Sequence, residues 1–208
     1  MPTKTLSTVR WLAVLALLAL TGAQRGQAQS QSDSAIYPSA LYPSAATATT
    51  RTPIVFIPGI MGSKLFNTLD GQENEVWVNL PRAITSNLSE LGLAADGVSP
   101  SRDDPAYTTS HTKPGTTGLV TRVLIADFYG TLVNHFTQTH GYVEGVDFWV
   151  YPYDWRKDLR TSANSLDVLI QNILTQTGAP QVSIVAHSLG GLVTRQYLSN
   201  PARAARVR

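Results

Sequence analysis

Apolar residues along the chain form two kinds of pattern, short runs and longer runs with helical spacing. The short runs, of which the second and third each contain one polar residue, predict buried strands at residues 53–57, 146–151 and 182–185. The runs with apolar residues three or four apart predict helices at residues 119–140, 166–175 and 192–198. The first strand is apolar throughout, which is typical of a parallel sheet covered on both faces. The order of these elements predicts an α/β protein with a mostly parallel sheet flanked by helices.

A long irregular stretch follows the first predicted strand. It runs from residue 64 to about 118 and contains few local signals. These predict a short strand at residues 75–79, a helix opened by proline at 81–91 and a turn at Asp96-Gly97. Because this length is too great for a plain connection, we predict a cap or lid inserted after the first core strand.

The first 51 residues are expected to lie outside the folded domain. Basic residues, an apolar run at 11–20 and small residues at 26–28 are typical of a secretory signal peptide, cleaved after Ala28 or, as a second choice, after Ala23. Residues 29–51 are rich in Ser, Ala, Thr and Gln, which predicts a disordered linker. We therefore expect a secreted or periplasmic protein whose folded domain occupies residues 52–208.

Removal of the leader changes the charge of the protein. The leader takes three basic and no acidic residues with it, so the net charge falls from +2 to −1. Because no basic stripe remains, we expect no nucleic-acid partner. The four histidines show no ligand spacing and the chain has no cysteine, so we also predict no metal, no cofactor and no disulfide.

The strongest chemical signal is Ser188, which lies between a predicted strand and a predicted helix. The stretch Ala186-His-Ser-Leu-Gly190 matches the nucleophile elbow G-x-S-x-G, with alanine at its first position. Ala186 and Gly190 are small where the strand and helix backbones must pass close together. The alternative is a serine that falls in a Gly-rich turn by chance, but the flanking strand and helix favour a catalytic nucleophile. We do not expect His187 to be the base, because its side chain should leave the turn in another direction.

Two backbone N–H groups are predicted to stabilise an oxyanion beside Ser188. One belongs to Leu189, at the N-terminus of the helix that follows the serine. The other belongs to Ile60, in the loop that begins at Pro58-Gly59 after the first strand. The alternative for this loop is an ordinary Pro-Gly turn. The presence of Ser188 in the same chain favours the functional interpretation.

The end of the strand at residues 146–151 carries one acidic and one basic residue, Asp154 and Arg156. We predict that they form an ion pair that holds their loop near the active edge of the sheet. A catalytic role for either residue is the less favoured alternative. Gly59 and Gly190 are expected to be structural residues near the site.

Three motifs together resemble the lecithin:cholesterol acyltransferase family, which includes lysosomal phospholipases and phospholipid:diacylglycerol acyltransferases. They are Pro53-Ile-Val-Phe-Ile-Pro-Gly-Ile-Met-Gly-Ser-Lys-Leu65, Tyr153-Asp-Trp-Arg156 and Ala186-His-Ser-Leu-Gly-Gly191. The second motif is the most discriminating, because many lipases and esterases share the elbow. The resemblance implies an α/β-hydrolase fold with Ser188 as nucleophile and the amides of Ile60 and Leu189 as its oxyanion hole.

The acid and base of that family have no counterpart in this sequence. Hydrolases of this fold run Ser, then Asp or Glu, then His, but none of the 20 residues after Ser188 is acidic or histidine. The elbow strand should also border a further strand, which the family would begin near residues 200–208. We therefore expect an incomplete α/β-hydrolase fold, the first part of a longer protein, which is inactive by itself.

The leading functional hypothesis is an exported lipid acyl hydrolase or O-acyltransferase that works through an acyl-serine intermediate. Its substrate would be a lipid or another acyl ester, at a membrane or lipid surface. The sequence does not distinguish water from an alcohol as the acyl acceptor, and it leaves the oligomeric state open. Two alternatives are a non-catalytic fragment that binds lipid or a partner, and a secreted amidase or peptidase on the same fold.

Overall fold

The computed structural model describes residues 50–69, 72–78, 91–95, 97, 112–113, 118–123 and 126–208. The predicted signal peptide lies outside these residues, and so do nearly all of the predicted linker and of the helix predicted at 81–91. The domain described below belongs to the unit that begins at Gln31.

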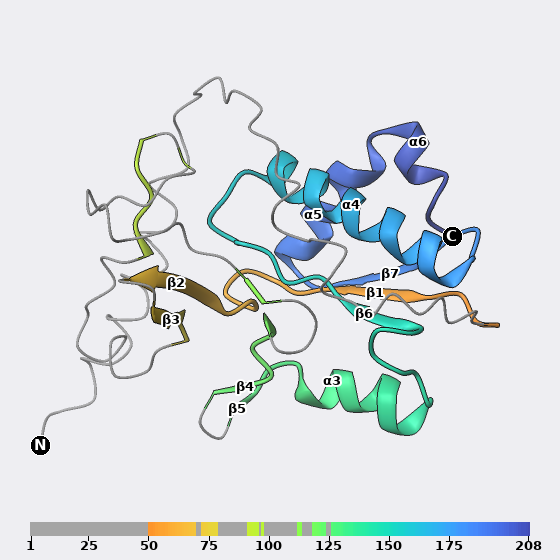
Figure 1. Cartoon of the computed structure of the whole chain (residues 1–208), viewed down its shortest axis with the longest axis horizontal. Coiled ribbons are helices and arrows are strands. Elements are labelled where there is room, and N and C mark those ends of the chain that lie inside the picture. The colour runs from red at the N-terminus through yellow and green to blue at the C-terminus, as the bar shows by residue number, and fades with distance from the viewer. Residues whose placement is uncertain are drawn as a thin grey trace, which may run out of the picture. The chain divides into compact units, whose positions relative to one another are not determined.

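A three-stranded parallel sheet forms the centre of the domain, with the strand order β6-β1-β7 (Figure 1). Its strands are β1 (Ile54–Ile57), β6 (Phe148–Val150) and β7 (Ser183–Ala186). Val55 in the middle strand lies opposite Trp149 on one side and Ile184 on the other. All four residues of β1 are buried, as its continuous apolar run predicts. The predicted α/β architecture with a parallel central sheet is confirmed.

Helices cover both faces of this sheet (Figure 1). One face carries α4 (Leu159–Thr177) and α5 (Leu189–Leu198), and the other carries α3 (Gly130–Asn134) with its π-helical continuation η5 (His135–Thr139). Side chains from the sheet reach both helical layers. Phe56 belongs to an apolar cluster against which residues of α3 and η5 pack, whereas the Tyr151 hydroxyl donates to Ser162 O in α4 at 2.6 Å. Among the described residues, no helix is long and apolar enough to cross a bilayer.

The chain continues past α5 through a short helix, α6 (Pro201–Ala204), and returns to the sheet. Val207 pairs in parallel with Val182, because Val182 N donates to Arg206 O and Arg208 N donates to Val182 O, both at 2.9 Å. The segment expected to begin a further strand beside β7 therefore makes its first contacts with the sheet.

The helix predicted at residues 119–140 is wrong over its first half. The chain instead forms a hairpin of β4 (Arg122–Val123) and β5 (Ala126–Asp127), and α3 begins only at Gly130. The Asp127 carboxylate accepts hydrogen bonds from Thr131 N and Thr131 Oγ1, at 3.0 and 2.9 Å, and the Thr131 hydroxyl is the main cause of its lowered pKa. Phe128, expected on the apolar face of a helix, is 59% exposed.

The predicted end of this helix is confirmed, because η5 ends at Thr139 before Gly141, which has φ 65°.

The described residues at the two ends of the stretch that follows β1 lie side by side. Lys64 N donates to Gly118 O at 2.7 Å, and Val120 N donates to Gly62 O at 2.9 Å. The described residues in between include an antiparallel hairpin of β2 (Leu65–Leu69) and β3 (Gln72–Trp77). Its second strand overlaps the strand predicted at 75–79, whereas the first was not predicted. The stretch is thus a separate excursion from the sheet, and its role as a lid stays a prediction.

Helix α4 starts earlier than its apolar spacing predicts, at Leu159 instead of Leu166. Asp158 is its N-cap, and the carboxylate accepts from Arg160 N at 2.7 Å. The helix ends where predicted, before Gly178 with φ 68°. Burial raises the pKa of the Asp158 carboxyl, but the hydrogen bonds and charge of Arg160 outweigh it and hold this pKa below its ordinary value.

Replacing Asp158 with alanine is expected to lower the free energy of unfolding by about 1 kcal/mol. Asp158→Asn keeps the acceptor oxygen and should lose much less. Because the folded carboxyl has a lowered pKa, its charge stabilises the fold above the pKa of an unfolded aspartate, and this share is lost as the pH falls through the folded pKa. Urea unfolding at neutral and acid pH measures both effects, and equal losses for the two variants would contradict the cap.

Candidate active site

Ser188 lies in the turn between β7 and α5, the elbow turn (residues 186–190), and is exposed to solvent. It is the N-cap of α5 and has φ 50° and ψ −119°, a backbone conformation that residues other than glycine rarely adopt. Among the described residues, only one other non-glycine residue has a positive φ, Met61 with φ 61°. Met61 lies in the loop after β1, the β1 loop (residues 58–63). Both strained residues therefore belong to the segments predicted to form the site.

The elbow turn and the β1 loop approach each other so closely that both Gly59 and Gly190 must lack a side chain. A Cβ atom on Gly190 would lie 2.5 Å from Ile57 O and 2.6 Å from Pro58 O, so no side chain fits there. A Cβ atom on Gly59 would lie 3.1 Å from Ser188 Cβ. The β1 loop thus runs directly against the serine, as an oxyanion loop must.

The two predicted oxyanion donors have no acceptor among the described residues. Gly62 N donates to Gly59 O at 3.0 Å, which closes the β1 loop as a tight turn with Ile60 at its tip, 43% exposed. Neither the N–H of Ile60 nor that of Leu189 donates to another of the described residues. Two main-chain donors without an acceptor in the described part of the chain therefore lie on the two segments that meet at Ser188.

The stretch Tyr153-Asp-Trp-Arg156 braces the β1 loop. The Tyr153 hydroxyl donates to Pro58 O and Trp155 Nε1 donates to Ser63 O, both at 3.1 Å. These bonds hold the first and last residues of the β1 loop. All four partners are buried, so both ends of the loop are anchored in the core while its tip at Ile60 is exposed.

The predicted ion pair between Asp154 and Arg156 is present. Arg156 Nε lies 2.7 Å from Asp154 Oδ1 and Nη2 lies 2.6 Å from Oδ2, a bidentate geometry. The side chains are only 6% and 8% exposed. Arg156 Nη1 also donates to Leu91 O at 3.2 Å. The pair therefore fixes the loop after β6 and ties it to the excursion that follows β1.

Tyr129 is a site residue that the sequence did not reveal. Its hydroxyl accepts a hydrogen bond from Gly59 N at 2.9 Å and lies 2.8 Å from His187 Nδ1. Burial raises the pKa of this phenol, and the Gly59 N–H only partly offsets the shift, so the hydroxyl keeps its proton at neutral pH. The His187 imidazole is thus engaged with Tyr129. The expectation that it is not the base for Ser188 stays a prediction.

Other ionisable groups do not complete a triad within the described part of the chain. No hydrogen bond joins the Ser188 hydroxyl to a described residue. His135 and His140 face each other across the end of η5, with ring centroids 4.5 Å apart. Among the described residues there is also no group of three or more side chains that could hold a metal ion.

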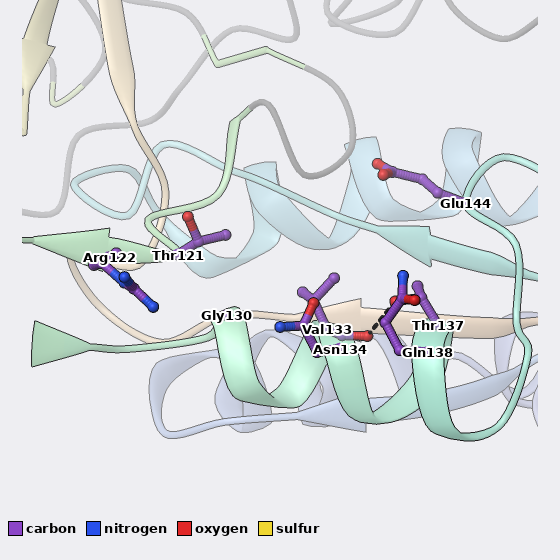
Figure 2. A pocket seen from close by; sticks show the side chains of 8 residues that line it. All are labelled: Thr121, Arg122, Gly130, Val133, Asn134, Thr137, Gln138 and Glu144. Atoms are coloured by element: carbon purple, nitrogen blue, oxygen red, sulfur yellow. Dashed lines mark hydrogen bonds between the residues drawn. The ribbon is translucent and has the colours of Figure 1, made fainter.

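An open groove of about 670 Å³ lies between the β4–β5 hairpin and α3 (Figure 2). None of the candidate site residues lines it. It is lined by Thr121, Arg122, Gly130, Val133, Asn134, Thr137, Gln138 and Glu144. The groove is therefore separate from the elbow turn.

Residues 120–205 match the family model of lecithin:cholesterol acyltransferase. This confirms the resemblance noted from the sequence over that part of the chain, which is less than half of its length. The matched range contains Tyr129, the Asp154–Arg156 pair and the elbow turn, but not the β1 loop. No curated protein matches the chain.

Proposed function

We propose, from the family match over residues 120–205 and the geometry of the elbow turn, that Ser188 is the nucleophile of a lipid acyl hydrolase or O-acyltransferase. A base removes the hydroxyl proton as Oγ attacks the carbonyl carbon of an acyl ester. The new C–O bond places negative charge on the carbonyl oxygen, which accepts hydrogen bonds from the N–H groups of Ile60 and Leu189. The alcohol then leaves with a proton, and an acyl-serine remains.

Water or a second alcohol completes the reaction by attacking the acyl-serine, which frees Ser188 and gives an acid or a new ester. The base and its acidic partner would come from residues other than those described, because the described residues near Ser188 supply neither. The family match favours lipids or other acyl esters as substrates and export as the route, and a lid role for residues 64–118 would suit such substrates.

The observation that carries this proposal is the strained conformation of Ser188 beside the β1 loop. An exposed serine with φ 50° at the start of a helix is costly unless the surrounding structure imposes it. Gly190 allows the helix to approach the end of β1, and Gly59 allows the β1 loop to reach the serine. A serine that falls in a Gly-rich turn by chance would not require α5 to approach β1, or the β1 loop to approach the serine, so closely.

A fluorophosphonate should label the protein expressed from its complete open reading frame, and the label should be on Ser188. Such probes phosphonylate serine hydroxyls that a base activates. Labelling should disappear in Ser188→Ala and persist in Ser199→Ala, which removes an exposed serine at the other end of α5. Gel fluorescence and peptide mass spectrometry measure it. Equal labelling of the wild type and Ser188→Ala would contradict the proposal.

A further inference from the structure

We propose that Tyr129 is a positioning residue whose hydroxyl locks the β1 loop to the elbow turn. Its oxygen bridges Gly59 N and His187 Nδ1, at 2.9 and 2.8 Å. Gly59 directly precedes Ile60, and His187 directly precedes Ser188. One phenol therefore joins the neighbours of the oxyanion donor and of the nucleophile. The catalytic part of this inference rests on the proposed function, whereas the structural part is tested separately below.

The polarity of the first of these two hydrogen bonds is fixed by the groups that make it. A backbone N–H can only donate, so the Tyr129 oxygen is the acceptor for Gly59. The Tyr129 O–H can then donate to His187 Nδ1 when the imidazole carries its proton on Nε2. In this arrangement all three polar groups are satisfied. The network also directs Nδ1 of His187 toward Tyr129.

The Tyr129 ring is held rigidly enough to fix the loop. It is 7% exposed and packs edge-on against Phe56, with centroids 5.1 Å apart and an interplanar angle of 64°. It also touches the far end of the β1 loop, because a Cβ atom on Gly62 would lie 2.8 Å from Tyr129 Cε2. The ring thus packs against the β1 loop near Gly62, while its hydroxyl accepts the hydrogen bond from Gly59 N.

Loss of the hydroxyl should affect the loop before it affects the fold. Phenylalanine keeps the ring and its packing but leaves Gly59 N–H without its acceptor in a buried place. The tip of the β1 loop then gains other orientations, and the Ile60 N–H no longer points steadily at the developing oxyanion. Because oxyanion stabilisation depends on this alignment, kcat should fall about 10- to 100-fold while KM changes little.

The test compares Tyr129→Phe with Tyr142→Phe in the protein expressed from its complete open reading frame. Tyr142 packs against the same apolar cluster, but its hydroxyl has no hydrogen bond to a described residue. We expect Tyr129→Phe alone to speed amide hydrogen exchange at Gly59, measured by NMR, and to lower kcat for ester hydrolysis at nearly constant KM. Urea unfolding of both variants measures any general loss of stability.

Three outcomes decide the inference. Unchanged Gly59 exchange in Tyr129→Phe would overturn the lock, and so would equal changes in exchange and kcat for both variants, which would indicate a general loss of core packing. Faster Gly59 exchange with unchanged kcat would overturn the positioning role. If the wild type shows no turnover that depends on Ser188, the proposed function fails, whereas faster exchange at Gly59 in Tyr129→Phe would still support the lock.

Discussion

Alanine at position 188 is expected to lower kcat for ester hydrolysis by the complete protein about 10⁵- to 10⁶-fold. Removing the nucleophile of a serine hydrolase abolishes the acyl-enzyme route, and only binding and oxyanion stabilisation remain. KM should change little, because Ser188 is exposed at the start of α5 and makes no hydrogen bond to a described residue. The release of product from a chromogenic ester, with active-site titration of the wild type, measures the loss. Residual activity above about 1% would contradict the nucleophile.

Glycine at the same position provides a sharper control. Ser188 has φ 50° and ψ −119°, where a side chain costs about 1–3 kcal/mol and glycine does not. Ser188→Gly should therefore be as inactive as the alanine variant but no less stable than the wild type, and up to about 2 kcal/mol more stable after the entropy of the unfolded glycine is counted. Activity and stability moving in opposite directions is the expected sign of a strained catalytic residue.

Breaking the buried ion pair is expected to cause the largest loss of stability. Arg156→Met leaves the Asp154 carboxylate without its bidentate partner in a site where the two side chains are 6% and 8% exposed. An uncompensated buried charge costs about 3–5 kcal/mol. Leu91 O also loses its donor, so the described part of the excursion loses an anchor. Urea unfolding of the variant measures the change.

Two further variants separate charge from packing. Arg156→Lys keeps the positive charge but cannot donate through both Nε and Nη2, so its loss should be intermediate. The double variant Asp154→Leu/Arg156→Met removes both charges and should recover most of the stability lost in Arg156→Met. A loss below about 1 kcal/mol in Arg156→Met would mean that the pair behaves as a solvent-exposed one.

The sequence predicted those parts of the fold that depend on local pattern. Strands β1, β6 and β7 come from short apolar runs, and each lies in the parallel sheet where its pattern places it. The burial predicted for them is confirmed for β1 and β6, whereas β7 is only partly buried. The elbow turn was predictable because strand, small residues and helix follow one another directly. Gly59 and Gly190 were predictable as structural residues, although the atoms that exclude a side chain became known only from the structure.

The errors arose where side-chain hydrogen bonds override apolar spacing. The four-residue spacing from Leu124 to Phe136 favoured one helix, but α3 starts only at Gly130, where the Asp127 carboxylate accepts a hydrogen bond from Thr131 N in its first turn. Asp158 likewise starts α4 a turn or more before its apolar stripe begins. Asp158 precedes its periodic residues, and a search for N-caps would have found it. Asp127 instead lies within the periodic stretch, and the N-cap of α3 is Tyr129.

Tyr129 could not be found from pattern alone. Its partners Gly59 and His187 are 70 and 58 residues away, so no local spacing connects them. The incorrect helix at 119–140 also placed Tyr129 as an ordinary helical residue. The bracing of the β1 loop by Tyr153 and Trp155 was hidden for the same reason, because those bonds span more than 90 residues. Candidate catalytic atoms were thus predictable locally, whereas the residues that align them required the fold.

The most direct test of the central claim is a crystal structure of the complete protein after phosphonylation. The phosphorus should be bonded to Ser188 Oγ, and its free oxygen should lie about 2.7–3.1 Å from the backbone nitrogens of both Ile60 and Leu189. Phosphonylation of another residue, or a phosphoryl oxygen that accepts a hydrogen bond from neither amide, would contradict the account.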